Sequence, residues 1–119
     1  MDSLQQFLYK LKLVPRLLEP ANWTDREHFR YLQQLLAENR LILAGRTQNM
    51  DETTFGIAIF LAESEEAAAS VMANDPAVKQ EVMTAELYLY RVALYNSQWE
   101  KQKKAEEPVR QKTRQALAG

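Results

Sequence analysis

The sequence predicts a small α+β domain whose elements follow in the order β-α-β-β-α-β. Two observations indicate this order. Four segments show the alternating or continuous apolar patterns of strands, and two others carry helix caps followed by apolar residues at helical spacing. The chain has 119 residues, no Cys, one His and a net charge of -1. A chain of this length can bury a core without disulfides, and the absence of thiols excludes cysteine nucleophiles and cysteine metal sites.

The first strand is expected over residues 6–14. Lys10 and Lys12 lie on one face, and the other face carries the apolar side chains Phe7, Tyr9, Leu11 and Leu13. Residues 15–22 contain two prolines and are expected to form a loop. The capping box at residues 24–27, Thr-Asp-Arg-Glu, then starts a helix that extends to residue 39.

The single histidine falls on the apolar face of this helix. With a 3.6-residue period, His28 shares a stripe with Leu32, Leu35 and Leu36. Two short apolar runs follow, at residues 41–44 and 55–61, separated by a polar stretch. They are expected to form two paired strands joined by a loop.

The second half of the chain repeats the pattern of helix and strand. Ser64 and two glutamates after it provide the start of a helix through Met72, which the sequence Asn-Asp-Pro at residues 74–76 ends. Residues 83–95 are rich in aromatic and branched side chains and predict a long fourth strand.

This element order is that of the ferredoxin-like fold, in which two helices cover one face of a four-stranded antiparallel sheet. The other face also needs a cover. A second copy of the chain is the natural one, so we expect a homodimer with two sheets face to face, a dimeric α/β barrel.

Residues 97–119 form a separate part of the chain. They carry six Lys and Arg against three Glu, which is +3 and leaves -4 for residues 1–96. A capping pattern at Ser97 predicts a C-terminal helical extension that packs by Trp99 and frays beyond Pro108. We therefore divide the chain into a domain, residues 1–96, and an extension, residues 97–119.

Composition also restricts partners and location. The mildly acidic domain lacks the broad basic face of a nucleic-acid binder, and the lysines of the extension alternate with glutamates. The chain shows no signal peptide and no apolar run long enough to span a membrane. We expect a cytoplasmic protein with no nucleic-acid or membrane partner.

Three residues stand out as candidates for a functional site. His28 is the natural proton carrier near neutral pH, or else a hydrogen-bonded core residue. Asp75 either caps a short helical turn that leads into Ala77, or orients His28 and favours its charged form. Arg46, next to Gly45, is a candidate for holding an anion.

The sequence resembles the YCII-related proteins over roughly residues 5–95. The resemblance is carried by residues 27–45, 65–67, 74–78 and the last strand. It implies a dimeric α+β barrel with a pocket around His28 and Asp75, and its best understood members resemble dehydrochlorinases or isomerases of small ring compounds. Two positions depart from many relatives: Ala77 replaces an aromatic residue, and Tyr88-Leu89 replaces His-Pro.

The leading hypothesis is a small enzyme that uses His28 and Asp75 for acid–base catalysis on a small cyclic or carbonyl compound, as a lyase, dehydrochlorinase or isomerase. Tyr9, Arg46 and Tyr88 are the candidate substrate-binding residues. No metal and no organic cofactor are expected. The alternatives are a non-catalytic dimer that binds a small molecule, and a protein-interaction dimer that presents its C-terminal extension.

Overall fold

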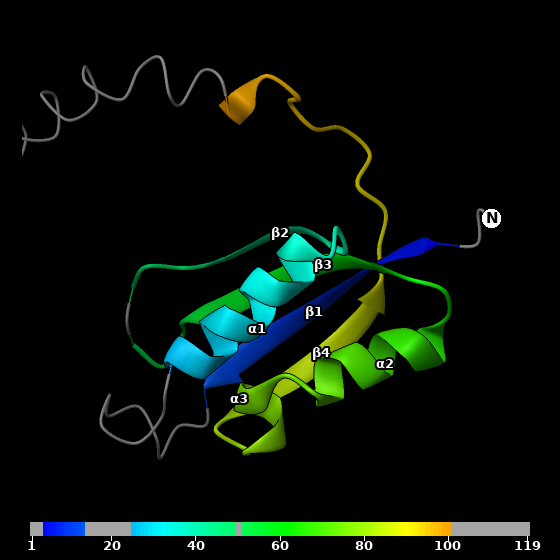
Figure 1. Ribbon diagram of the computed structural model, residues 1–119. Helices are drawn as coiled ribbons and strands as arrows, with labels where there is room; N and C mark the ends of the chain where they lie inside the picture. The colour runs from blue at the N-terminus through cyan, green and yellow to red at the C-terminus, as the bar shows by residue number, and fades with distance from the viewer. Residues whose placement is uncertain (1–3, 14–24, 50, 101–119) are drawn as a thin grey trace, which may run out of the picture.

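The computed structural model describes residues 4–13, 25–49 and 51–100, and the predicted order of elements is confirmed with one short helix added (Figure 1). The strands are β1 (Gln5–Leu13), β2 (Leu41–Arg46), β3 (Phe55–Ala62) and β4 (Met83–Leu89). The helices are α1 (Asp25–Ala37), α2 (Glu65–Ala73) and α3 (Pro76–Lys79). The capping residue predicted for α1, Thr24, lies outside the described residues.

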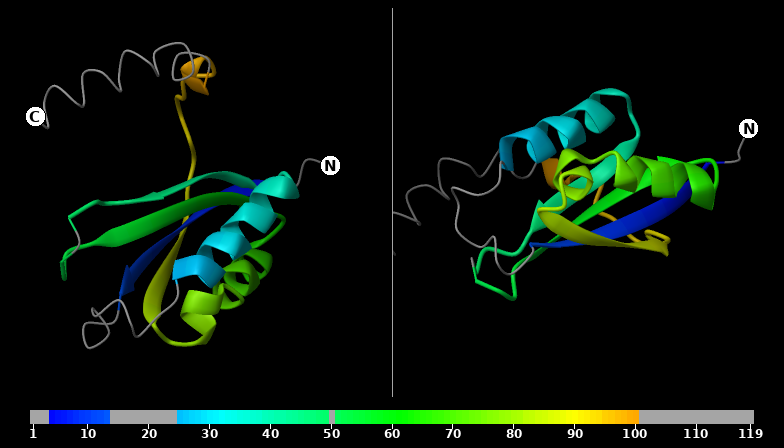
Figure 2. Two further views of the ribbon diagram at one scale, coloured as in Figure 1. Left: turned by 60° about the vertical axis from the view of Figure 1, so that its left-hand side comes forward. Right: turned by 90° about the horizontal axis from the view of Figure 1, so that it is seen from below.

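The four strands form one antiparallel sheet in the order β2-β3-β1-β4. All three helices lie on the same face of the sheet, as the view from below in Figure 2 shows. The protein therefore has the predicted ferredoxin-like α+β fold. None of the helices in the described ranges is long and apolar enough to cross a membrane.

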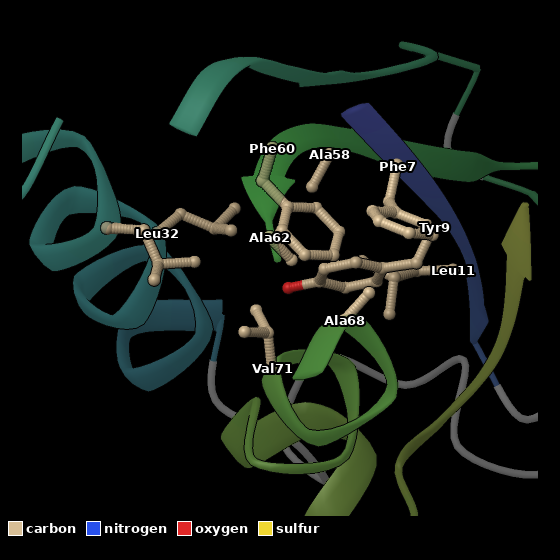
Figure 3. Packing of buried hydrophobic residues seen from close by; sticks show 10 residues of the cluster. Phe7, Tyr9, Leu11, Leu32, Ala58, Phe60, Ala62, Ala68 and Val71 are labelled. Carbon is tan, nitrogen blue, oxygen red and sulfur yellow. The ribbon is translucent and has the colours of Figure 1, made fainter. Parts of the chain in front are cut away.

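The alternation in β1 decides which face of the sheet is buried. Tyr9 lies opposite Ala58 of β3 and Leu87 of β4, so these three side chains share the face covered by the helices. Phe60 packs its ring edge-on against Tyr9, with the ring centroids 5.6 Å apart (Figure 3). The remaining core side chains come from β1, β3, α1 and α2: Phe7, Leu11, Leu32, Leu35, Ala62, Ala68 and Val71.

Helix α1 ends at Ala37, and two residues later Asn39 adopts a left-handed conformation with a φ of 64°. Asparagine tolerates this conformation, which is common just after the end of a helix. Leu32 and Leu35 are buried as expected, but Leu36 is 58% exposed, so its predicted place in the buried stripe is wrong. Leu36 lies at the edge of the stripe, and a helix on a sheet contacts it with a narrower face than the apolar pattern suggests.

The fourth strand is shorter than predicted, because β4 ends at Leu89 and not at residue 95. A strand continues only while a neighbour offers backbone partners, and β1 begins at Gln5. Beyond Leu89, the amide of Tyr90 donates to the Gln6 carbonyl and the amide of Val92 donates to Gln6 Oε1. The segment then leaves the sheet.

The predicted extension is described only as far as residue 100. Residues 99 and 100 are helical, and the Gln98 amide donates to Asn96 Oδ1 at 2.8 Å, so Asn96 provides the polar cap in place of Ser97. The side chain of Trp99 is 56% exposed. The part around Pro108 lies outside the described residues.

Candidate functional site

Asp75 occupies the junction between α2 and α3. Its Oδ1 accepts a hydrogen bond from the Ala77 amide at 3.0 Å, and Pro76 takes the first helical position, where its missing amide costs nothing. The capping role suggested by the sequence is thus confirmed. Unlike most N-caps, however, this carboxylate is fully buried, with an exposed fraction of 0%.

His28 reaches the same carboxylate from α1. Its Nδ1 lies 2.8 Å from Oδ2 and 2.9 Å from Oδ1 of Asp75. One carboxylate therefore caps α3 and also contacts the histidine. The pair joins elements that are 47 positions apart in the sequence.

Tyr9 provides a third contact from beneath. Its hydroxyl, which points from β1 toward the helix layer in Figure 3, donates to Asp75 Oδ2 at 2.8 Å. Both side chains are fully buried. The carboxylate thus meets a hydroxyl, a backbone amide and an imidazole nitrogen, which is the partnering that a buried charge requires.

The partners of Asp75 determine the tautomer of the histidine. An ionised carboxylate only accepts hydrogen bonds, so we assign the hydrogen of the neutral His28 ring to Nδ1. The other ring nitrogen, Nε2, has no hydrogen-bond partner among residues 4–13, 25–49 and 51–100. The His28 side chain is 13% exposed and that of Asp75 is 0% exposed, so within the pair only the histidine contacts solvent.

The buried carboxylate of Asp75 raises the pKa of two tyrosines. The pKa of Tyr9 is raised, first by burial and then by the charge of Asp75 and the hydrogen bond to it. The pKa of Tyr31 is raised by burial and, next, by the same charge. The Tyr9 hydroxyl therefore remains a hydrogen-bond donor throughout the range in which proteins function.

The raised pKa of Tyr9 predicts how stability changes at alkaline pH. Below the ordinary tyrosine pKa of 10.0, Tyr9 is protonated in both the folded and the unfolded chain. Above it, the unfolded chain loses this proton and the folded one keeps it, so the free energy of unfolding falls by about 1.4 kcal/mol per pH unit on account of Tyr9.

Urea unfolding at several pH values from about 9 to about 11.5 measures this slope. The variant Tyr9→Phe should show a shallower fall than the natural chain. Because both proteins share every other tyrosine and lysine, the difference in slope reports Tyr9 alone. Parallel slopes would show that Tyr9 ionises equally easily in the two states.

A hollow of about 400 Å³ lies between α1 and α3, and neither His28 nor Asp75 is among the residues that line it. Its walls include the neighbours of both site residues in the sequence: Glu27 next to His28, and Asn74 and Pro76 on either side of Asp75. Two cationic side chains, Arg30 and Lys79, also line it. The Tyr31 hydroxyl donates to the Val71 carbonyl at 2.6 Å and so ties the wall on α1 to α2.

The other two predicted site residues lie elsewhere. Arg46, at the end of β2, lines a separate hollow of about 300 Å³ with Phe55 and Ile57. Tyr88 lies opposite Leu8 in the sheet and therefore faces away from the helices, where its hydroxyl donates to Glu86. The structure thus groups Tyr9, His28 and Asp75, and it places Arg46 and Tyr88 apart from them.

Sequence reasoning missed two contacts of this site. It placed Tyr9 among the substrate-binding candidates, without its bond to Asp75, and it did not single out Tyr31. A tyrosine on the buried face of a central strand was the available signal, because a buried hydroxyl needs a polar partner.

In the described part of the chain, no third His, Cys, Asp or Glu joins His28 and Asp75 as a group fit to hold a metal ion.

The fold and the site together define a ferredoxin-like α+β domain with a buried carboxylate–histidine pair. The family model of the YCII-related domain matches residues 6–89, and the chain belongs to this family. The match extends from the second residue of β1 to the end of β4 and includes both members of the pair.

The chain is similar to two solved structures. The 5-chloro-2-hydroxyhydroquinone dehydrochlorinase TftG of Burkholderia phenoliruptrix AC1100, solved with 2,5-dihydroxybenzoquinone, is 25% identical, with a TM-score of 0.59 over 72% of this chain and 93% of that one. SnoaB, a cofactor-independent oxygenase of Streptomyces nogalater, is 11% identical, with a TM-score of 0.46 over 81% of this chain and 99% of that one. No curated protein matches the chain.

Proposed function

We propose that the protein is a small enzyme in which His28 transfers a proton to or from a small cyclic compound that bears hydroxyl or carbonyl groups. One observation carries the proposal: His28 Nδ1 is held on the buried carboxylate of Asp75, while Nε2 is left without a partner among the described residues. The likeness to a dehydrochlorinase solved with a dihydroxybenzoquinone supports the choice of substrate class.

The chemistry follows from the tautomer. With the hydrogen on Nδ1, Nε2 of the neutral ring offers a lone pair to an O–H or an acidic C–H of the substrate. As the proton moves to Nε2, the ring becomes a cation that the Asp75 carboxylate stabilises. In an elimination, the leaving group departs with its electron pair as this proton is removed. In an isomerisation, Nε2 returns the proton to another atom of the substrate.

Tyr9 acts through Asp75 and is a positioning residue in this proposal. Its hydroxyl is 2.8 Å from Oδ2 and fixes the orientation of the carboxylate against which the imidazole ring packs. The hydrogen bond also lowers the cost of keeping a charge at a site with no solvent exposure. The earlier expectation that Tyr9 binds substrate directly is less well supported, because its side chain is 0% exposed.

Binding of a ligand is the first test, and it uses the fact that His28 is the only histidine. Its ring gives one set of imidazole signals in an NMR spectrum, so no assignment by mutation is needed. Titration with 2,5-dihydroxybenzoquinone should shift the His28 ring signals in a saturable way. Saturable binding that leaves these signals unmoved would place the ligand elsewhere and contradict the proposal.

A turnover assay then separates catalysis from binding alone. If the ligand class binds at His28, a panel of chlorinated hydroquinones should then be converted, with release of chloride into solution. Tight binding of every member without conversion would favour the alternative of a non-catalytic small-molecule binder.

We also propose that the protein is a homodimer. The face of the sheet opposite the helices carries Tyr88, which is 47% exposed, and Leu43, which is 46% exposed. Exposed apolar side chains on one sheet face, here beside the polar Lys10 and Glu86, favour an interface. Sedimentation at micromolar concentration should give the mass of two chains, and the mass of one chain would contradict the proposal.

A further inference from the structure

The hollow between α1 and α3 is separate from the acid–base pair, because neither His28 nor Asp75 lines it. The two helices lie side by side in the helix layer, as the left view of Figure 2 shows, and the hollow occupies the groove between them. Its volume of about 400 Å³ is within the usual range for small-molecule sites, about 300–1,000 Å³. The chemistry of its walls indicates which kind of molecule it fits.

Helical spacing places the wall residues on facing sides of the groove. The wall on α1 consists of Glu27, Arg30, Tyr31 and Gln34, which have the i, i+3, i+4, i+7 spacing of one helix face. The wall on the other side consists of Pro76, Lys79 and Gln80, with Asn74 before them. A hydrogen bond of 3.0 Å from Gln80 Nε2 to Glu27 Oε1 joins the two walls. The hollow is therefore held open in a defined shape.

Most polar side chains of these walls already have partners. Glu27 accepts from Gln80, Gln34 donates to Glu38, Asn74 donates to Ser70, and Tyr31 donates to the Val71 carbonyl. The exceptions are the exposed cations Arg30 and Lys79, which have no hydrogen-bond or ion-pair partner among residues 4–13, 25–49 and 51–100. One such cation is ordinary on a surface, but here two, on opposite helices, line one hollow. This pair favours an anion as the ligand.

We propose that the hollow binds a small phosphorylated compound that bears hydroxyl groups, and that Arg30 and Lys79 hold its phosphate from opposite sides. The guanidinium of Arg30 presents a planar fork that can donate two parallel hydrogen bonds to a phosphate. The ammonium of Lys79 adds a compact positive charge. This site is additional to the one proposed at His28, and it does not depend on the chemistry there.

The size and the acceptors of the hollow indicate the rest of the ligand. Inorganic phosphate alone would fill only a part of 400 Å³, so the ligand has an organic part. Glu27 uses Oε1 and Asn74 uses Nδ2 in the hydrogen bonds described above. Their other polar atoms, Oε2 and Oδ1, are acceptors that suit hydroxyl groups. A sugar phosphate combines both features.

Isothermal titration of ribose 5-phosphate into the full chain tests the site. We expect saturable binding that is at least about tenfold tighter than that of inorganic phosphate or of ribose, because only the ester reaches both parts of the hollow. Binding should weaken as salt is added, since charges in an open hollow are screened. The absence of saturable binding up to about 10 mM ester, or equal affinity for inorganic phosphate, would overturn the proposal.

Substitution of the two cations locates the phosphate. The variants Arg30→Gln and Lys79→Gln should each raise the Kd for ribose 5-phosphate at least about tenfold, because each removes charge-assisted hydrogen bonds. Both side chains are exposed, so the Tm without ligand should stay close to that of the natural chain.

The matched control is Lys12→Gln. It removes an exposed cation from the face of the sheet opposite the helices, since Lys12 alternates with the buried Leu11 along β1. This variant should leave the Kd within about threefold. Equal weakening in all three variants would mean that only the net charge matters, and it would contradict a site between α1 and α3.

A competition experiment distinguishes this site from the one proposed for catalysis. Saturating 2,5-dihydroxybenzoquinone, or the substitution His28→Gln, should leave the Kd for ribose 5-phosphate within about threefold, because His28 does not line the hollow. Displacement of the ester by the quinone would place both in one site and overturn this inference. If the quinone fails to bind, the proposal for His28 is wrong, and the titrations with ribose 5-phosphate still decide on the hollow.

Discussion

Replacing Asp75 with Ala should lower the free energy of unfolding by about 3–5 kcal/mol, because it removes the acceptor of three donors in a site without solvent. The Tyr9 hydroxyl, the Ala77 amide and His28 Nδ1 all contact this carboxylate within 3.0 Å. After the substitution, the hydroxyl and the amide remain buried without partners, and the short helix α3 loses its cap. Urea unfolding at fixed protein concentration measures the loss.

Two controls make this test specific. Asp75→Asn keeps an oxygen of similar position, so it should retain the cap and lose only about 1–2 kcal/mol. Glu63→Ala removes an exposed carboxylate and should change stability by less than about 0.5 kcal/mol. A loss for Asp75→Ala no larger than that for Glu63→Ala would mean that the buried contacts described here do not stabilise the fold.

Replacing His28 with Gln should lower kcat by a factor of about 10² to 10⁴ for any substrate that the protein converts, the contribution of a positioned general acid or base. Gln has hydrogen-bonding groups and can still contact Asp75, but it cannot accept a proton near neutral pH. Ligand binding should change far less than kcat. The measurement is the turnover of chlorinated hydroquinones, followed by chloride release.

The matched variant for this test is Arg46→Gln. Arg46 lies at the end of β2 and lines the hollow with Phe55, apart from the His28 pair. If the substrate lies beside His28, Arg46→Gln should leave kcat within about threefold. Equal losses of kcat in the two variants would move the site away from α1, and full activity of His28→Gln would exclude the proposed proton carrier.

The fold was largely predictable because its signals are local. Alternation in β1 fixes the buried face, and the caps at Ser64 and Asp75 fix two helix starts. Where the prediction failed, the cause was not local. The end of β4 at Leu89 depends on where β1 begins, which no pattern within residues 83–95 contains. Likewise, the exposure of Leu36 depends on how much of α1 the sheet contacts.

The candidate site was predictable in part. The single His on an apolar helix face and the Asp before a proline both carry chemistry that the sequence shows, and the family resemblance brought them together. Their separation of 2.8 Å, and the hydroxyl of Tyr9 on the same carboxylate, arise from packing between distant elements. A single sequence reports residue types and spacing, but not which buried side chains meet.

The tautomer of His28 tests the central claim most directly. A long-range proton–nitrogen NMR spectrum of the natural chain, recorded at a pH at which the ring is neutral, distinguishes the two ring nitrogens of this single histidine. We expect the hydrogen on Nδ1, bonded to Asp75, and an unprotonated Nε2. A ring protonated mainly on Nε2 would show that Asp75 does not hold Nδ1, and that the proposed proton carrier is not prepared for its role.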